Sequence, residues 1–371
     1  MNKRIHGMDA LRGIAMWLGV VLHSVISYQK NPRAGWPLDN SSSIVMDFIY
    51  EYLHAFRMPL FFLVAGFFAH FLYKKIGMKP FIIHRAKRIL VPFILSIIFV
   101  VPVCGYVFAI HRLLQDSYTG NIFVAAIEES LHWTGFYHIW FLYYLMILYG
   151  IMLVGEQVLN RSKAVPSLTE AGYFGSTIVL ICIQFFFYQG QVEPWTGIVP
   201  KTGQILYYAY FFGLGYLIYL KPDFLFKHEK LRYCYLLVGV ILIPVISYVQ
   251  DSIPYWAYSI LLSIQTNLLI LGHIAVFMNI FKRESPIVRY FSDASYWFYL
   301  IHFPIVVGLQ MLLMNFNISV WLKCFIVIST TTFFSIITYE YFVRYTWIGT
   351  ILNGKKVRNS ESLQLVGSRN K

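Results

Sequence analysis

An arginine and a histidine lie eleven positions apart in one strongly apolar stretch, RGIAMWLGVVLH, which runs from Arg12 to His23. Eleven residues make close to three turns of an α-helix, so the two side chains share one face about 16 Å apart along the axis. Gly19 lies between them on that face and leaves space beside the helix. This spacing indicates a base, His23, at the far end of a slot whose near end, at Arg12, is cationic. The alternative is an arginine that extends to the membrane surface and a hydrogen-bonded structural histidine.

A second apolar stretch, DFIYEYLHAFRMPLFF, carries four ionisable residues within eleven positions. Asp47, Glu51 and His54 follow i, i+4, i+7 spacing, which places them on one helix face, and Arg57 follows three residues after His54. A carboxylate from Asp47 or Glu51 could orient the His23 imidazole, and Arg57 or His54 could stabilise a developing oxyanion. The alternative is that Asp47 and Glu51 belong to a solvated outer turn, which for Asp47 alone is the more natural interpretation.

A cationic cluster precedes the third apolar stretch, in HRAKRILVPF. Arg85, Lys87 and Arg88 lie within four positions there. Such a cluster could bind the phosphates of a nucleotide-like donor such as coenzyme A, with Arg12 as a further contributor. Its alternative is the ordinary excess of basic residues on the cytoplasmic side of a membrane protein.

Five further polar residues fall inside apolar stretches and are expected to be mainly structural: His138, Asn267, His273, His302 and Glu340. Of these, His302 is the strongest candidate for a direct role. The histidines do not recur at metal-ligand spacing, so no metal is predicted.

The elements that position these residues are predicted to be transmembrane helices. The chain has 371 residues, of which 58% are hydrophobic and only 13% charged, and its mean hydropathy is +0.60. A soluble chain carries roughly a quarter charged residues. We therefore expect an all-α, polytopic membrane protein with about ten spans of about 20 residues each, at 8–28, 44–73, 89–110, 138–159, 172–188, 203–220, 232–250, 256–280, 293–314 and 319–342.

The distribution of basic residues predicts the orientation. With a cytoplasmic N-terminus, 23 of the 30 Lys and Arg residues fall in inner segments and four in outer loops, as the positive-inside rule requires. Ten spans then place both termini in the cytoplasm. This distribution explains the net charge of +13 without nucleic acid as a partner. We expect residues 1–346 to form one transmembrane domain and residues 347–371 a polar cytoplasmic tail.

The order of these motifs resembles the acyltransferase-3 family of bacterial membrane acyltransferases. The matching features are the R-x10-H spacing of Arg12 and His23, FRMPLFFLVAGFF, the RAKR segment, HIWFL and SYWFYLIHFP. The segment DFIYEYLHAFRM is similar to the branch that contains glucan-modifying succinyltransferases. The resemblance implies that His23 is the essential histidine, Arg12 its partner, and Arg85 and Arg88 the cytoplasmic pair that meets the donor.

The resemblance implies a membrane O-acyltransferase of the bacterial inner membrane. It further implies that an acetyl or succinyl group moves from cytoplasmic acyl-CoA to a hydroxyl, often of a carbohydrate, on the extracytoplasmic side. The pantetheine arm would run past Gly19 to His23, which either deprotonates the acceptor or carries the acyl group. A transporter or flippase of an acylated or lipid-linked sugar is the alternative, with the same charges lining a substrate path.

Overall fold

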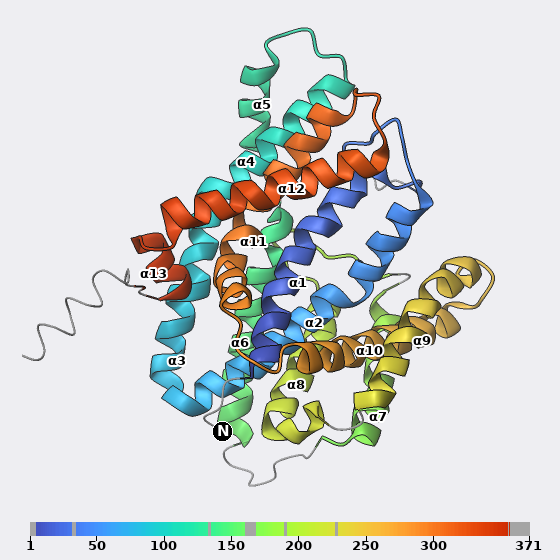
Figure 1. Cartoon of the computed structure of the whole chain (residues 1–371), viewed down its shortest axis with the longest axis vertical. Coiled ribbons are helices and arrows are strands. Elements are labelled where there is room, and N and C mark those ends of the chain that lie inside the picture. The colour runs from blue at the N-terminus through green and yellow to red at the C-terminus, as the bar shows by residue number, and fades with distance from the viewer. Residues whose placement is uncertain are drawn as a thin grey trace, which may run out of the picture.

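The computed structural model describes residues 5–31, 35–132, 135–159, 168–188, 191–226, 229–354 and 356. In these ranges the regular elements are all helical, and β pairing is limited to two isolated bridges, which confirms the all-α fold. The long helices are α1 (His6–Val25), α2 (Ile44–Ile76), α4 (Val91–Gln115), α6 (Trp140–Leu159), α7 (Glu170–Phe187), α8 (Thr202–Leu220), α9 (Glu229–Val249), α10 (Tyr255–Ile280), α11 (Pro286–Leu313) and α12 (Val320–Thr338) (Figure 1).

Each of the ten predicted spans corresponds to one of these helices. Within the described ranges, nine stretches are long and apolar enough to cross a membrane, and α8 is the one predicted span outside that set. The reason is its composition, since five tyrosines lower the hydropathy of this 19-residue helix. It is nevertheless packed into the bundle along α2.

Helix α1 lies at the centre of the bundle, where it packs most extensively on α11 and also contacts α2, α10 and α12 (Figure 1). The polar side chains of α1 therefore contact other helices. Arg12 illustrates this, because its guanidinium donates to Ser292 Oγ of α11 at 3.1 Å and lies over the ring of Phe68 of α2. The face of α1 that carries Arg12 and His23 therefore packs against α11.

Helices α2 and α8 approach each other unusually closely. A Cβ added to Gly66 would lie 2.0 Å from the carbonyl oxygen of Phe212, and one added to Gly215 would lie 1.8 Å from that of Leu63. Small residues at such a crossing let two helix backbones come together in the membrane, where packing replaces the hydrophobic effect as the driving force. This contact fixes the relative positions of α2 and α8, both of which contribute residues to the cavity described below.

The third span begins well before its apolar segment. A short helix, α3 (Met78–Arg85), continues through a π-helical turn, η2 (Ala86–Leu90), into α4, so that Met78–Gln115 forms one helical run. The RAKR segment occupies the junction. A π-helical turn widens the backbone and recurs at functional sites.

Part of the predicted tail is folded. Helix α13 (Trp347–Asn353) contacts η2, α4 and α11, and Asn353 Nδ2 donates to the carbonyl of Asp293 at 2.7 Å. The remainder of the predicted tail, from residue 357 on, lies outside the described residues.

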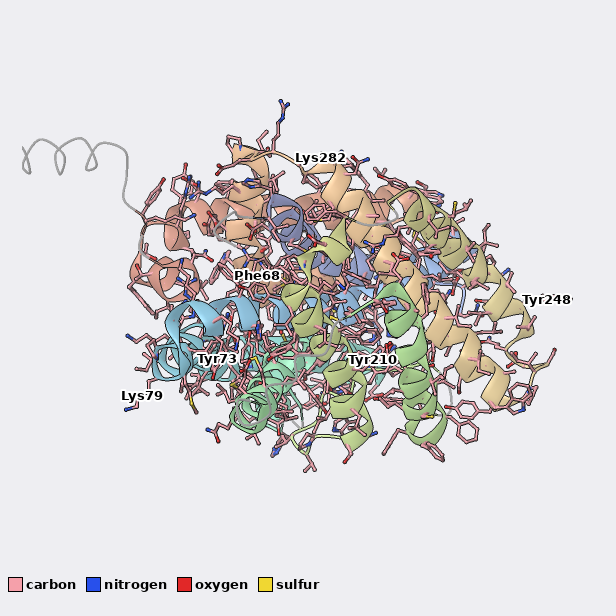
Figure 2. The ribbon with its side chains drawn as sticks, turned by 90° about the horizontal axis from the view of Figure 1, so that it is seen from below. Phe68, Tyr73, Lys79, Tyr210, Tyr248 and Lys282 are labelled. Atoms are coloured by element: carbon pink, nitrogen blue, oxygen red, sulfur yellow. The ribbon has the colours of Figure 1, made fainter. Side chains whose placement is uncertain are left out.

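The outer surface of the bundle is apolar. Large hydrophobic side chains such as Phe186, Phe325 and Tyr248 are strongly exposed, Tyr248 at 87%. Figure 2 shows Tyr248 and Lys79 at the periphery, pointing away from the helices. A continuous apolar exterior of this kind requires lipid around it.

Candidate active site

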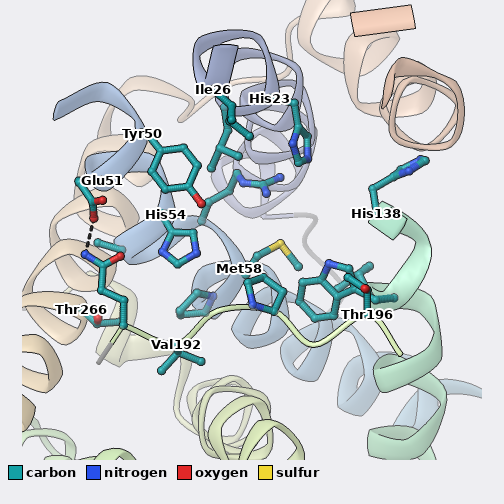
Figure 3. A pocket seen from close by; sticks show the side chains of 18 of the residues that line it. His23, Ile26, Tyr50, Glu51, His54, Met58, His138, Val192, Thr196 and Thr266 are labelled. Carbon is teal, nitrogen blue, oxygen red and sulfur yellow. Dashed lines mark hydrogen bonds between the residues drawn. The ribbon is translucent and has the colours of Figure 1, made fainter. Parts of the chain in front are cut away.

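A cavity of about 460 Å³ opens among α1, α2, α6, α8, α10 and α11 (Figure 3). Of the ten residues predicted from the sequence to form the catalytic and donor-binding sites, four line it: His23, Glu51, His54 and Arg57. The other six, Arg12, Gly19, Asp47, Arg85, Lys87 and Arg88, lie outside its lining. The structure thus brings together the histidine of the first span and three ionisable residues of the second.

Three histidines from distant parts of the chain meet at one end of the cavity. The ring centroid of His302 in α11 lies 5.4 Å from that of His23 and 5.1 Å from that of His138, which belongs to the short helix η3 (Tyr137–Ile139). His302 and His138 are 2% and 5% exposed. The sequence analysis expected both to be mainly structural, as lone histidines on apolar faces usually are, and their place in the cavity makes both of them candidates for a direct role. Both also lie in HIWFL and SYWFYLIHFP, two of the segments that carry the family resemblance.

Hydrogen bonds indicate which nitrogen of each imidazole carries the proton. His302 Nδ1 lies 2.9 Å from the carbonyl of Tyr299 and 3.0 Å from that of Phe298. A carbonyl can only accept, so Nδ1 is the N–H, and Nε2 of a neutral His302 is a free acceptor. By the same argument His138 holds its proton on Nε2, 3.1 Å from the carbonyl of Leu300. Within the described residues, His302 Nε2 and His23 Nδ1 are buried without a hydrogen-bond partner.

Arg57 occupies the space beside Gly19. A Cβ at position 19 would lie 2.7 Å from Arg57 Nη1 and 3.9 Å from His302 Nε2. In the part of the chain that the structure describes, no carboxylate pairs with Arg57, and its Nε is buried without a hydrogen-bond partner. A cation held this way in a cavity is costly unless an anion arrives. The gap beside Gly19, which we predicted for a pantetheine arm, is filled in this structure by Arg57.

The carboxylates of α2 have partners other than His23. Both oxygens of Asp47 accept backbone N–H groups, from Lys30 at 2.8 Å and Asn31 at 3.0 Å. Glu51 accepts a hydrogen bond from Gln191 Nε2. The expected carboxylate–imidazole pair with His23 is absent among the described residues. Asp47 instead fixes the turn that follows α1, a buried position that differs from the solvated one favoured for it.

His54 is also engaged with another residue. Its Nε2 lies 3.6 Å from Glu193 Oε2, and its ring stacks on Tyr50 with centroids 5.3 Å apart. His54 is therefore at the cavity wall but is directed toward Glu193.

The imidazole of His23 is held by aromatic rings. Its ring lies 5.7 Å from that of Trp36 at an angle of 9°, and 5.0 Å from that of Phe303 in an edge-on contact. The Trp36 indole N–H lies 3.1 Å from Ser27 Oγ and 3.0 Å from Gln310 Oε1. The sequence analysis missed Trp36, since a residue in a loop after a span carries no periodicity that would point to His23.

A buried ion pair fastens the loop that carries Trp36. Lys323 Nζ of α12 lies 2.9 and 2.6 Å from the two oxygens of Asp39, and both side chains are 1% exposed. The Asp39 backbone N–H also donates to the carbonyl of Ser27 at 3.0 Å. This pair ties the loop between α1 and α2 to α12.

The predicted donor-binding residues form a separate cluster. Arg85 lies over the rings of Phe81 and Tyr149, with its guanidinium carbon 5.3 and 5.2 Å from their centroids. Arg88 is close enough to Arg85 and Arg12 for their charges to interact, whereas Lys87 is exposed. Three arginines thus converge from α1, α3 and η2.

Two tyrosines of α11 lie between this cluster and the cavity. Tyr299 lines the cavity, and its ring centroid is 6.3 Å from that of Tyr296. Tyr296 in turn donates to the backbone carbonyl of Arg88 at 2.9 Å. As the described residues delimit it, the cavity does not reach Arg12, Arg85 or Arg88.

Together the fold and the site define a multi-pass membrane protein with a histidine-lined cavity among its helices. In the described ranges no three His, Cys, Asp or Glu side chains are placed to hold a metal ion. The chain belongs to the acyltransferase-3 family, whose model, described as an acyltransferase domain, matches residues 5–340. It is thus a membrane acyltransferase, and both the family and the enzyme class predicted from the sequence are confirmed.

Curated relatives of the chain include proteins named for glucan biosynthesis. Glucans biosynthesis protein C from Salmonella typhimurium (strain LT2) and from Salmonella typhi are each 24% identical to this chain over 323 residues. The alignments cover 81% of this chain and 82% of each relative. No solved structure matches the chain.

Proposed function

We propose that this protein transfers an acetyl or succinyl group from cytoplasmic acyl-CoA to a hydroxyl of a glucan or similar carbohydrate on the extracytoplasmic side of the bacterial inner membrane. Family membership supports the acyl transfer. The relatives named for glucan biosynthesis support the acceptor class. The observation that carries the proposal is the meeting of His23, His302 and Arg57 in one cavity of a membrane-spanning bundle.

His23 acts on the acceptor hydroxyl or carries the acyl group in passing. His302, with its free Nε2, is a second base close by and can receive the proton that His23 gives up. That proton goes on to the coenzyme A thiolate, which leaves when the C–S bond of the thioester breaks. In either role, attack on the thioester carbonyl places negative charge on the carbonyl oxygen. Arg57 is a nearby guanidinium without a carboxylate partner among the described residues, and it stabilises that oxyanion.

The donor docks its phosphates on the arginine cluster. Arg85 and Arg88 contribute charge and hydrogen-bond donors, with Arg12 beside them and Lys87 at the exposed edge. The pantetheine arm then has to pass the stacked pair Tyr296 and Tyr299 to reach His23. In this proposal, donor binding moves those side chains and the Arg57 guanidinium away from Gly19, and so joins the cluster to the cavity.

A test uses the purified protein in proteoliposomes with radiolabelled acetyl-CoA or succinyl-CoA and a soluble glucan. The wild type should transfer label to the glucan, and His23→Gln should lose at least about a hundredfold in rate, as expected for removal of a general base. His132→Gln, at an exposed histidine just after α5 (Ile122–Ser130), is the matched control. Wild-type transfer rates in folded His23→Gln protein would refute the mechanism.

The sidedness needs its own measurement. A fluorescent protein fused after residue 371 should fold and fluoresce in the cytoplasm. A phosphatase inserted at Gly120, between α4 and α5 (Ile122–Ser130), should be active outside. The reverse pattern would contradict the proposed direction of transfer.

A further inference from the structure

The cavity has two chemically different ends. His23, His138 and His302 define one. At the other, polar side chains from α2, α10 and the segment after α7 face the same space (Figure 3). We call this second end the carboxylate–amide wall; it consists of Glu51, His54, Gln191, Gln265 and Thr266. Figure 3 places Glu51 and Thr266 across the cavity from His138.

The wall offers both donors and acceptors of hydrogen bonds. Glu51 accepts from Gln191 Nε2, while Gln191 Oε1 is buried and has no partner among the described residues. Gln265 and Thr266 are each 3% exposed and add an amide and a hydroxyl. A carboxylate, two amides and a hydroxyl match a ligand whose neighbouring hydroxyl groups each donate and accept.

Flat aromatic faces accompany these polar groups. Tyr50 stacks on His54, and Tyr208 lies 5.2 Å from Tyr207 and 5.4 Å from Trp140, measured between ring centroids. All four aromatic residues line the cavity. Sugar rings have polar edges and apolar C–H faces, so a pocket that combines hydrogen-bonding side chains with aromatic faces suits them.

The charged residues in and around the cavity favour different positions for the donor and the acceptor. Glu51 lines the wall, and Glu193 lies beside it on His54. Arg57 lines the cavity at the histidine end, beside Gly19, whereas Arg12, Arg85 and Arg88 lie outside the lining. The phosphates of a coenzyme A donor are repelled by the carboxylates, whereas a neutral, hydroxyl-rich ligand is not. A volume of about 460 Å³ is large enough to enclose most of a small ligand of one or two sugar rings.

We propose that the carboxylate–amide wall binds the saccharide acceptor and presents one of its hydroxyls to His23. The acceptor therefore enters from the side of Glu51 and Gln191, and the donor from the side of the arginine cluster. This inference rests on the proposed function, because it assigns the acceptor of that reaction to a defined part of the same cavity.

The test separates the Michaelis constants of the two substrates. Glu51→Ala, Gln191→Leu and Thr266→Val are purified and checked for a monodisperse, cooperatively unfolding protein. They are assayed with labelled acyl-CoA and short linear glucose oligosaccharides. Glu284→Gln, an exposed carboxylate paired with Arg289 outside the cavity, is the matched control. The three substitutions lie in three different segments of the chain. If one variant does not fold, the other two still test the inference.

We expect the acceptor KM to rise about tenfold or more in the folded wall variants, as the loss of a hydrogen bond to a buried partner predicts. The KM for acyl-CoA should change less than about twofold. An unchanged acceptor KM, or a rise in the acyl-CoA KM instead, overturns the inference. So does a wild type that hydrolyses acyl-CoA but acylates no oligosaccharide and is not slowed by any. A wild type that consumes no acyl-CoA overturns the proposed function itself.

Discussion

The guanidinium of Arg57 rests against the bare backbone of Gly19, where a Cβ would lie 2.7 Å from Nη1. This contact joins the second span to the first at a point one helical turn before His23. It explains why a glycine suits position 19, since any side chain there would displace the cation from the histidines.

Gly19→Ala should therefore impair catalysis more than stability. The added methyl group pushes Arg57 away from the reacting atoms, and a shift of about 1 Å in a catalytic group costs on the order of a hundredfold in rate. Single-turnover rates of purified protein measure the effect. Gly308→Ala in α11 is the control, because a Cβ there meets nothing within 4 Å. Equal activity of the two variants would show that Arg57 does not need its present position.

Arg57→Met should reduce kcat by about 10²–10³-fold if the guanidinium stabilises the oxyanion. Arg57→Lys keeps the charge but has a different donor geometry, so it should recover only part of the loss. The kcat of each variant, measured at saturating acyl-CoA and acceptor and compared with that of the wild type, tests this prediction. A methionine variant that alters only the KM for acyl-CoA would place Arg57 in donor binding instead.

His302→Gln should slow transfer by about 10²-fold, since a glutamine cannot take up a proton. His273→Gln, which replaces a buried histidine of α10, is the comparison variant. The His273 ring is engaged on both nitrogens, with Tyr52 Oη at 2.7 Å and the carbonyl of Leu269 at 2.7 Å. Its replacement should lower the melting temperature more than the rate. The idea of a second base fails if His302→Gln retains wild-type kcat.

Replacement of Arg85 and Arg88 by glutamine should raise the KM for acyl-CoA about tenfold or more per residue, because each loses a charge-assisted contact with phosphate. The difference in the KM for acyl-CoA between variant and wild type should be smaller in high salt, because salt screens the charge on the phosphates. Lys79→Gln is the matched control, since Lys79 is exposed at the periphery of the same helical run (Figure 2). If Lys79→Gln weakens donor binding equally, the arginines act only through the general surface charge.

Lys323→Met should destabilise the protein by about 3–5 kcal/mol, because it leaves Asp39 buried without its partner. The double variant Asp39→Asn, Lys323→Met should recover part of that loss. Both should also lower activity, since the loop they hold carries Trp36 against His23. The stability of each variant is measured by thermal unfolding, monitored through tryptophan fluorescence. A double variant no more stable than Lys323→Met alone would argue against the ion pair as the cause.

The sequence alone was enough for the class of fold and for the helices. Apolar runs of about 20 residues predict membrane helices because the bilayer leaves the backbone no other way to satisfy its hydrogen bonds. The same local logic placed Arg12 and His23 on one face of α1, and the four ionisable residues in α2. Such inferences need only the periodicity of one helix.

Contacts between helices could not be obtained in this way. That His302 and His138 lie beside His23, that Trp36 covers its ring and that Arg57 fills the gap at Gly19 depend on how α1, α2, η3 and α11 pack. The carboxylates are a second example of contacts that periodicity does not predict. Helical spacing made Asp47 a candidate partner of His23, but its hydrogen-bond partners are the backbone N–H groups of Lys30 and Asn31. Local periodicity determines which face a side chain occupies, and only the packing of the whole bundle decides what that face meets.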